Sequence, residues 1–145
     1  MDVYAETILE HYRHPQGKKR LPSPTVTHEE VNHACGDALT VDLVLRDGNI
    51  AVIGWEGTGC AISQAGMSLL SEELSGMTAE GAEALTKQDM DAMLGVPIGP
   101  RRFKCALLSL HTVKNALRKW RGEEAQGWLE TVQLAEHEPL RRIIT

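Results

Sequence analysis

Three cysteines carry the chemistry that this sequence offers, and each stands at a junction between predicted elements. Cys35 closes a predicted strand just before a glycine, whereas Cys60 and Cys105 each open a predicted helix. The start of a helix presents unpaired N–H groups and a partial positive charge, which lower the pKa of a thiol. Because the thiolate is the form that ligates metals and attacks sulfur, these positions indicate metal binding or sulfur chemistry.

An acidic residue, Asp37, follows Cys35 by two positions and adds an oxygen ligand. Zinc accepts four tetrahedral ligands drawn from sulfur, nitrogen and oxygen, so three thiolates and one carboxylate would complete a zinc site. Gly36, Gly57 and Gly59 would let the backbone approach such a site closely. The alternative is that the thiols are ordinary buried side chains, since the Cys-x-x-Cys spacing of common zinc sites is absent. The sequence alone does not show that the three loops meet.

The composition is that of one ordinary globular domain over residues 1–145. The chain is 42% hydrophobic and 24% charged, with a net charge of −5. This acidic balance disfavours nucleic acid as the main partner, and no apolar run is long enough to cross a bilayer. The N-terminus lacks the pattern of a signal peptide, so we expect a cytoplasmic protein without a membrane partner. In a reducing compartment, an odd number of cysteines indicates ligands or free thiols rather than a disulfide framework.

Apolar alternation predicts the strands that lead to the cysteine loops. The clearest pattern runs from Leu39 to Arg46, and Asp47-Gly48 then predicts a hairpin turn before a strand from Ile50 to Trp55. A further strand over Val26–Asn32 is expected from a weaker pattern.

Helical periodicity predicts the elements that carry Cys60 and Cys105. The predicted helices span Val3 to about Tyr12, Ile62 to Gly76, Thr78 to about Met93, and Ala106 to Trp120. Thr78 is expected to cap the helix that it begins, and the segment Val96–Pro100 breaks the chain before the last helix. Strands first and helices later predict an α+β fold, with a small antiparallel three-stranded sheet and helices packed on one face.

Four segments of the chain resemble the U-type iron–sulfur cluster assembly proteins, a family that includes IscU, SufU and the N-terminal domain of NifU. The matching segments are AETILEHYRHPQGKKRL, NHACGDALTVDL, GTGCAISQAGMSLLSEEL and RFKCALLSLHTVKNAL. The order and spacing of all three cysteines agree with this family. The resemblance implies a SufU/IscU-like fold and a site that holds zinc or a nascent [2Fe–2S] cluster.

Carried over to this sequence, the resemblance implies metal ligands at Cys35, Asp37, Cys60 and Cys105. It also implies that sulfur comes from a SufS-like pyridoxal-phosphate cysteine desulfurase and passes to a downstream scaffold or apoprotein. The resemblance to SufU also implies that Cys35 is the persulfide acceptor, and its place on a loop beside Gly36 would let it move most easily. Asp37 is a hard ligand in a soft site and is expected to ease release of the metal.

The residue before the third cysteine separates two branches of the family. IscU-type scaffolds have histidine there, after an LPPVK motif, whereas this chain has Lys104 after IGPRRF. Lys104 itself is either a solvated residue of the first helical turn or a group that stabilises a thiolate or persulfide at Cys105. The segments CAISQA and RFKCALL likewise resemble SufU, but the insertion that SufU proteins usually carry between Cys60 and Cys105 is absent.

We therefore predict a SufU-like zinc protein that accepts persulfide sulfur, which would make it a sulfurtransferase acting with a desulfurase. The first alternative is an IscU-like scaffold that assembles and transfers a [2Fe–2S] cluster on the same residues and is not an enzyme. The second is an interaction domain with incidental cysteines. Two histidines have simpler explanations: His33 is expected to be partly exposed, and His111 to lie on a different face of its helix from Cys105.

Overall fold

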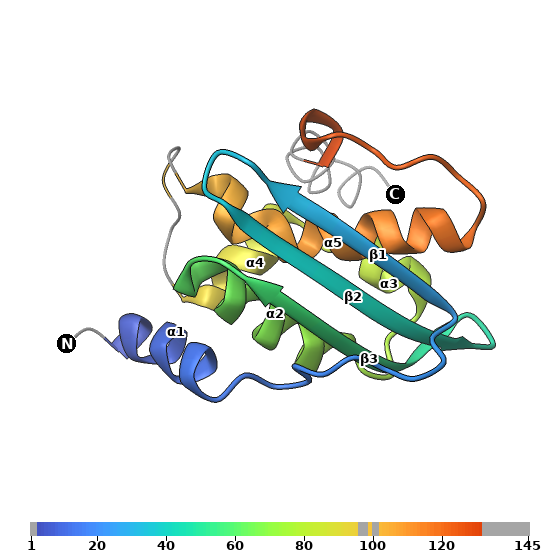
Figure 1. Cartoon of the computed structure of the whole chain (residues 1–145), viewed down its shortest axis with the longest axis horizontal. Helices are drawn as coiled ribbons and strands as arrows, with labels where there is room; N and C mark the ends of the chain where they lie inside the picture. Colours follow the sequence, from blue (N-terminus) through green and yellow to red (C-terminus); the bar gives the residue numbers. More distant parts are fainter. Residues whose placement is uncertain (1–2, 96–98, 100–101, 132–145) are drawn as a thin grey trace, which may run out of the picture.

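Figure 1 shows the computed structural model of the chain, which describes residues 3–95, 99 and 102–131. The elements in chain order are α1 (Val3–Arg13), β1 (Val26–Asn32), β2 (Asp37–Arg46), β3 (Asn49–Thr58), α2 (Ala61–Leu74), α3 (Ala79–Glu83), α4 (Lys87–Leu94) and α5 (Phe103–Trp120). The predicted break at Val96–Pro100 lies outside the described residues, apart from Gly99.

The strands form an antiparallel sheet in the order β1-β2-β3. β1 pairs with β2 so that Asn32, at the end of one strand, lies opposite Asp37, at the start of the other. The turn between β2 and β3 has positive φ at Asp47 (55°) and Gly48 (77°), as the common two-residue hairpin turn requires. The predicted hairpin is confirmed, and β3 continues as far as Thr58, nearer to the second cysteine than the sequence indicated.

One face of the sheet is covered by α2 and α5, which lie behind the strands in Figure 1. The buried core between them includes Leu39, Val41, Leu43 and Trp55 of the sheet, Met67 and Leu70 of α2, and Leu110, Val113 and Leu117 of α5. Burial of these apolar side chains is the main force that holds the layers together. The predicted α+β fold is confirmed. Within the described residues, no helix has both the length and the apolar character that crossing a membrane requires.

The inner face of β1 is mostly polar, which explains its weak sequence pattern. Successive side chains of a strand point to opposite faces of the sheet. Counting every second residue from the buried Val26, the side chains on the helix side are those of His28, Glu30 and Asn32. There α5 supplies a polar partner, because Asn115 Nδ2 donates to Glu30 Oε2 at 2.8 Å. Polar groups on the strand thus pair with polar groups on the helix instead of with apolar side chains.

The predicted helix from Thr78 to about Met93 is wrong, because two helices, α3 and α4, stand in its place. Thr78 caps α3, as predicted, by accepting a hydrogen bond from a backbone N–H of its first turn. Thr86 then begins α4 with a capping box, in which the side chains of Thr86 and Asp89 each accept from the other's backbone N–H. A threonine three residues before an acidic residue was the signal for this second start.

Asp42 lies on the opposite face of the sheet and is fully buried under the segment that precedes β1. It accepts hydrogen bonds from Arg20 Nε at 2.7 Å, the backbone N–H of Leu21 at 2.9 Å and Thr27 Oγ1 at 2.7 Å. Burial alone would raise the pKa of Asp42, but these bonds and the positive charge of Arg20 outweigh burial and lower it. The carboxylate thus fastens the chain before β1 to the sheet.

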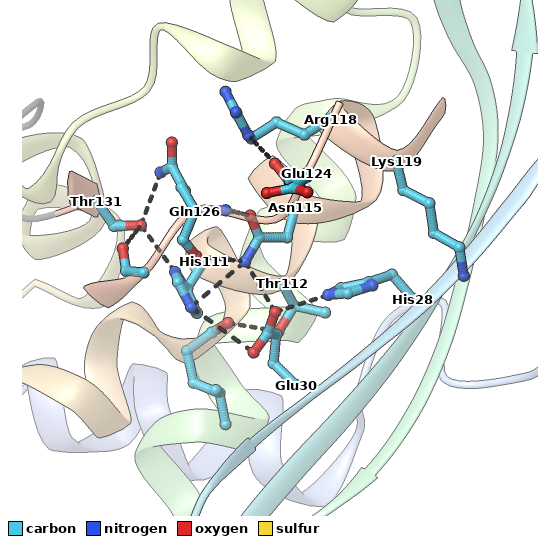
Figure 2. A network of polar contacts seen from close by, with 12 residues as sticks. His28, Glu30, His111, Thr112, Asn115, Arg118, Lys119, Glu124, Gln126 and Thr131 are labelled. Carbon is cyan, nitrogen blue, oxygen red and sulfur yellow. Dashed lines mark hydrogen bonds and ion pairs between the residues drawn. The ribbon is translucent and has the colours of Figure 1, made fainter. Parts of the chain in front are cut away.

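After α5 the chain reverses and returns along that helix, as the orange and red trace in Figure 1 shows. Residues 126–131, here called the C-terminal clasp, are joined to α5 by a buried polar network (Figure 2). Asn115 holds the backbone of Gln126 from both sides, with Nδ2 donating to its carbonyl at 3.0 Å and Oδ1 accepting from its N–H at 2.7 Å. His111 Nδ1 and Gln126 Nε2 both reach Thr131 Oγ1, at 2.7 and 2.8 Å.

Candidate metal centre

Cys35 lies in the turn between β1 and β2 and is exposed. The strand predicted over Val26–Asn32 is confirmed as β1, so Cys35 lies three residues beyond the strand instead of closing it. The backbone N–H groups of Cys35 and Gly36 both donate to the carbonyl of Asn32, at 3.3 and 2.9 Å. Gly36 has a φ of 73°, a conformation that favours glycine, so this turn presents the thiol at the surface.

Asp37 is the first residue of β2 and is fully buried. Its Oδ1 accepts the backbone N–H of Cys60 at 2.8 Å, and its Oδ2 lies 4.0 Å from Cys60 Sγ. Between them, Gly59 has a φ of 131°, and a Cβ at this position would collide with Asp37 Oδ1. The close backbone approach expected at Gly59 is therefore present, and it docks the carboxylate at the start of α2.

Cys105 lies in the first turn of α5, is 4% exposed and places its Sγ 3.3 Å from Cys35 Sγ. The candidate ligand atoms of Cys35, Asp37 and Cys105 all lie within 4.8 Å of one another. Cys60 is not part of this tight group but meets it through Asp37. The fold thus brings near one another all four side chains that the sequence singled out, from the β1–β2 connection and the starts of α2 and α5; their role as ligands stays a prediction.

The donor set fits a soft or borderline metal ion. Three sulfur atoms and one carboxylate oxygen are the ligand types that zinc accepts, and thiolates are also the ligands that iron–sulfur clusters use. Several acids share the site, so their full deprotonation would place like charges within a few ångströms of one another. A bound cation would offset this repulsion.

The pKa of Cys105 is raised, which contradicts the expectation that the helix N-terminus lowers it. Burial of the thiol is the largest cause, followed by its contact with the Cys35 thiol and by the proximity of the acidic groups of Cys60 and Asp37. Desolvation and neighbouring acids therefore dominate over the helix dipole at this position. Both causes favour the neutral thiol of Cys105.

Lys104 points to the C-terminal clasp. Its Nζ lies 5.9 Å from the centre of the Trp128 ring, within the range of a cation–π contact. Trp128 in turn stacks on His111, with ring centroids 4.1 Å apart. Lys104 and His111 are two helical turns apart, so they share a stripe of α5 that faces the clasp, as expected for a histidine turned away from Cys105. A direct role of Lys104 at Cys105 stays a prediction.

Two polar residues beside the thiols were missed by the sequence predictions. Ser63 donates to the carbonyl of Cys60 at 3.0 Å and places its Oγ 3.8 Å from Cys60 Sγ. Asn32 places its Nδ2 4.0 Å from Cys105 Sγ. For Ser63, its place three residues after Cys60 was a usable signal, whereas the contact of Asn32 depends on tertiary structure. His33 is exposed, as expected.

Comparison with known proteins identifies the family. The sequence profile of the NifU-like N terminal domain matches residues 3–126, and the chain belongs to this family. The iron–sulfur cluster assembly scaffold protein IscU of Thermotoga maritima is 31% identical over 133 residues, covering 81% of this chain and 94% of that protein. The zinc-dependent sulfurtransferase SufU of Bacillus subtilis is 27% identical over 137 residues, covering 83% and 92%. A crystal structure of a nitrogen-fixing NifU-like protein from Brucella abortus shares the fold, with a TM-score of 0.70, 24% identity and coverage of 83% and 95%.

Proposed function

We propose that this protein serves iron–sulfur cluster biogenesis by accepting sulfur from a cysteine desulfurase, with Cys35 as the acceptor. The observation that carries the proposal is the unequal exposure of two thiols in contact: Cys35 is at the surface, whereas Cys105 is 4% exposed. A persulfide on a partner protein can reach only an exposed thiol. Membership of the family and the similarity to IscU and SufU support the general function.

In the proposed step, the Cys35 thiolate attacks the terminal sulfur of a persulfide on the desulfurase. A new sulfur–sulfur bond forms on Cys35 while the bond within the donor persulfide breaks, and the desulfurase cysteine leaves as a thiolate. No oxidant is consumed, because one persulfide replaces another. Cys35 suits this exchange because it is exposed on a short turn, which backbone bonds to Asn32 and the left-handed Gly36 support.

Zinc is the proposed resident ion, with Cys35, Asp37, Cys60 and Cys105 as its ligands. Bound zinc would keep the thiols deprotonated and shield them from oxidation. The protein's own contribution is to dock Asp37 on the backbone of Cys60 and to bury Cys105, so that two ligands are fixed before the ion binds. The similarity to a zinc-dependent sulfurtransferase, together with Lys104 before the third cysteine, favours zinc over iron.

The second candidate is a scaffold that receives iron and sulfur and passes a [2Fe–2S] cluster, as its cargo, to an apoprotein. The similarity to an IscU scaffold favours it, as does the absence of an insertion between Cys60 and Cys105. In this case Asp37 would be the weak ligand that lets the cluster leave, since clusters are held best by thiolates. Both candidates share the same side chains and the same partner, a SufS-like pyridoxal-phosphate cysteine desulfurase.

The test starts from metal analysis of the protein purified without added iron. The protein is then incubated with a cysteine desulfurase and L-cysteine, and alanine production and sulfur bound to each cysteine peptide are measured by mass spectrometry. For the wild type we expect bound zinc, faster alanine production and added sulfur on Cys35. The control variant His33→Ala should give the same three results. Cys35→Ala should abolish both sulfur binding and stimulation. Full sulfur acceptance by Cys35→Ala would contradict the mechanism, and iron with cluster transfer but no stimulation would favour the scaffold.

A further inference from the structure

Asn32 lies between two of the candidate ligands, Asp37 and Cys105. It is the last residue of β1, is 3% exposed and lies opposite Asp37 in the strand register. Because inward positions alternate along β1, its side chain points to the helix side of the sheet, where α5 begins. Asn32 thus lies beside two candidate ligands, Asp37 and Cys105.

The main chain of Asn32 supports the turn that carries Cys35. Its carbonyl accepts hydrogen bonds from the N–H groups of Cys35 and Gly36, at 3.3 and 2.9 Å. Any residue at this position would offer the same carbonyl. A substitution of Asn32 therefore leaves this part of the site in place and changes only what the side chain does.

The side chain of Asn32 acts on a different cysteine. Its Nδ2 lies 4.0 Å from Cys105 Sγ, on a sulfur that is itself 3.3 Å from Cys35 Sγ. The hydrogen bond from an amide N–H to a sulfur is stronger when the sulfur carries negative charge, as in a metal-bound thiolate. Groups that hydrogen-bond to ligands orient them and tune the metal that they hold.

We propose that Asn32 is a positioning residue that holds Cys105 as the fixed ligand of the centre. This inference rests on the proposed metal centre and deepens it. The amide donor lies against the sulfur of Cys105 and holds it in place, whereas the exposed Cys35 lies on a turn held by backbone hydrogen bonds to Asn32. The centre therefore has one anchored sulfur and one sulfur free to move, which is the division of roles that sulfur acceptance at Cys35 requires.

The test compares zinc affinity in Asn32→Leu and in the wild type, by competition with a chromophoric chelator. Leucine is similar in volume but has no donor. Loss of a group that supports a ligand typically weakens metal binding about 10- to 100-fold, so we expect a loss of about tenfold or more. The cobalt(II) form should show a shifted sulfur-to-cobalt absorption band. His33→Ala, an exposed neighbour, serves as the control and should leave zinc affinity unchanged.

The same substitution is then made in two further backgrounds. If Asn32 acts through Cys105, Asn32→Leu should have no effect on zinc affinity in Cys105→Ser but should keep its full effect in Cys35→Ser. Equal losses in both backgrounds, or no loss in a folded Asn32→Leu protein, would overturn the proposal. Asn32→Thr, whose hydroxyl is too short to reach the sulfur, replaces the leucine variant if circular dichroism shows that the latter does not fold.

The outcome is separable from that of the proposed function. A wild-type protein that binds zinc but accepts no sulfur contradicts sulfur acceptance at Cys35, while the affinity cycle still decides the role of Asn32. A wild-type protein that binds neither zinc nor cobalt contradicts both.

Discussion

The backbone N–H of Cys60 donates to Asp37 Oδ1 at 2.8 Å, so the candidate oxygen ligand is already tied to the start of α2. One carboxylate oxygen is thereby occupied by the protein itself. The other, Oδ2, faces Cys60 Sγ at 4.0 Å and is the one that a metal could use. Asp37 thus has two separable roles, as a dock for the backbone and as a ligand through a single oxygen.

Two substitutions of Asp37 should separate these roles. Asp37→Asn keeps an oxygen that accepts the Cys60 N–H but loses the carboxylate, whereas Asp37→Ala loses both. We expect both variants to slow sulfur transfer and to retain the metal longer against a chelator. Only Asp37→Ala should also destabilise the metal-free protein, by about 1–3 kcal/mol, because it leaves a partly buried N–H unpaired. Urea unfolding measures the difference, and equal stability of the two variants would show that the dock contributes nothing.

Gly59→Ala should damage the site more than comparable glycine substitutions. The new Cβ meets both a φ of 131° and the carboxylate of Asp37. Gly36→Ala meets only the positive φ of 73°, with open space around the Cβ, and should cost about 1–2 kcal/mol of unfolding free energy. Gly127→Ala has neither problem and serves as the control. Urea unfolding and zinc affinity should rank the three variants in this order, and a Gly59→Ala protein as stable as Gly36→Ala would refute the close approach.

Much of the fold could be predicted because its local signals agree with its packing. The β2–β3 hairpin follows from apolar alternation around Asp47-Gly48, and α5 from its apolar spacing. β1 gave a weak signal because its inner residues, such as Glu30, pair with polar groups of α5 that lie far away in the sequence. The division between α3 and α4 was missed because apolar spacing continues across Thr86, where the capping box restarts the helix.

Stability should fall in acid because of Asp42. The folded-state pKa of this carboxyl lies below its ordinary value of 3.8, since bonds from Arg20, Leu21 and Thr27 outweigh the effect of burial. Its contribution is therefore present above about pH 4 and is lost as the pH falls through the folded-state value. Asp42→Asn should lower the unfolding free energy at neutral pH by about 2 kcal/mol. The difference from the wild type should shrink as the pH falls below about 4, and a difference that is constant with pH would contradict this assignment.

His111 should make stability depend on pH in a milder range. Burial lowers its pKa below the ordinary 6.5, despite the nearby charge of Glu30, and His28 lowers it further. The unfolded chain therefore binds a proton more readily than the folded one, so stability falls as the pH drops below about 6.5. The melting temperature of the wild type should decrease between about pH 7.5 and pH 5.5 more steeply than that of His111→Phe, which keeps an aromatic ring against Trp128 but cannot titrate. Equal slopes for the two proteins would show that His111 has no such role.

The candidate site, like the fold, has features that the sequence predicts and features that depend on tertiary structure. The identities of Cys35, Asp37, Cys60 and Cys105 could be predicted from motifs within short segments of sequence. Their mutual distances could not, because they depend on how the β1–β2 connection packs against the starts of α2 and α5. The raised pKa of Cys105 was missed for the same reason: the helix N-terminus is visible in the sequence, but burial and neighbouring acids are not.

The match to the family profile ends at Gln126. The side chain of Asn115 forms hydrogen bonds with both the N–H and the carbonyl of this residue. A protein cut at that boundary would retain all of α5 yet lose the indole that covers His111 and the hydroxyl of Thr131. The helix that bears Cys105 would then expose an aromatic ring and several unpaired polar groups to water. Residues 127–131 therefore belong with α5 structurally, and a shortened version of the protein should keep them.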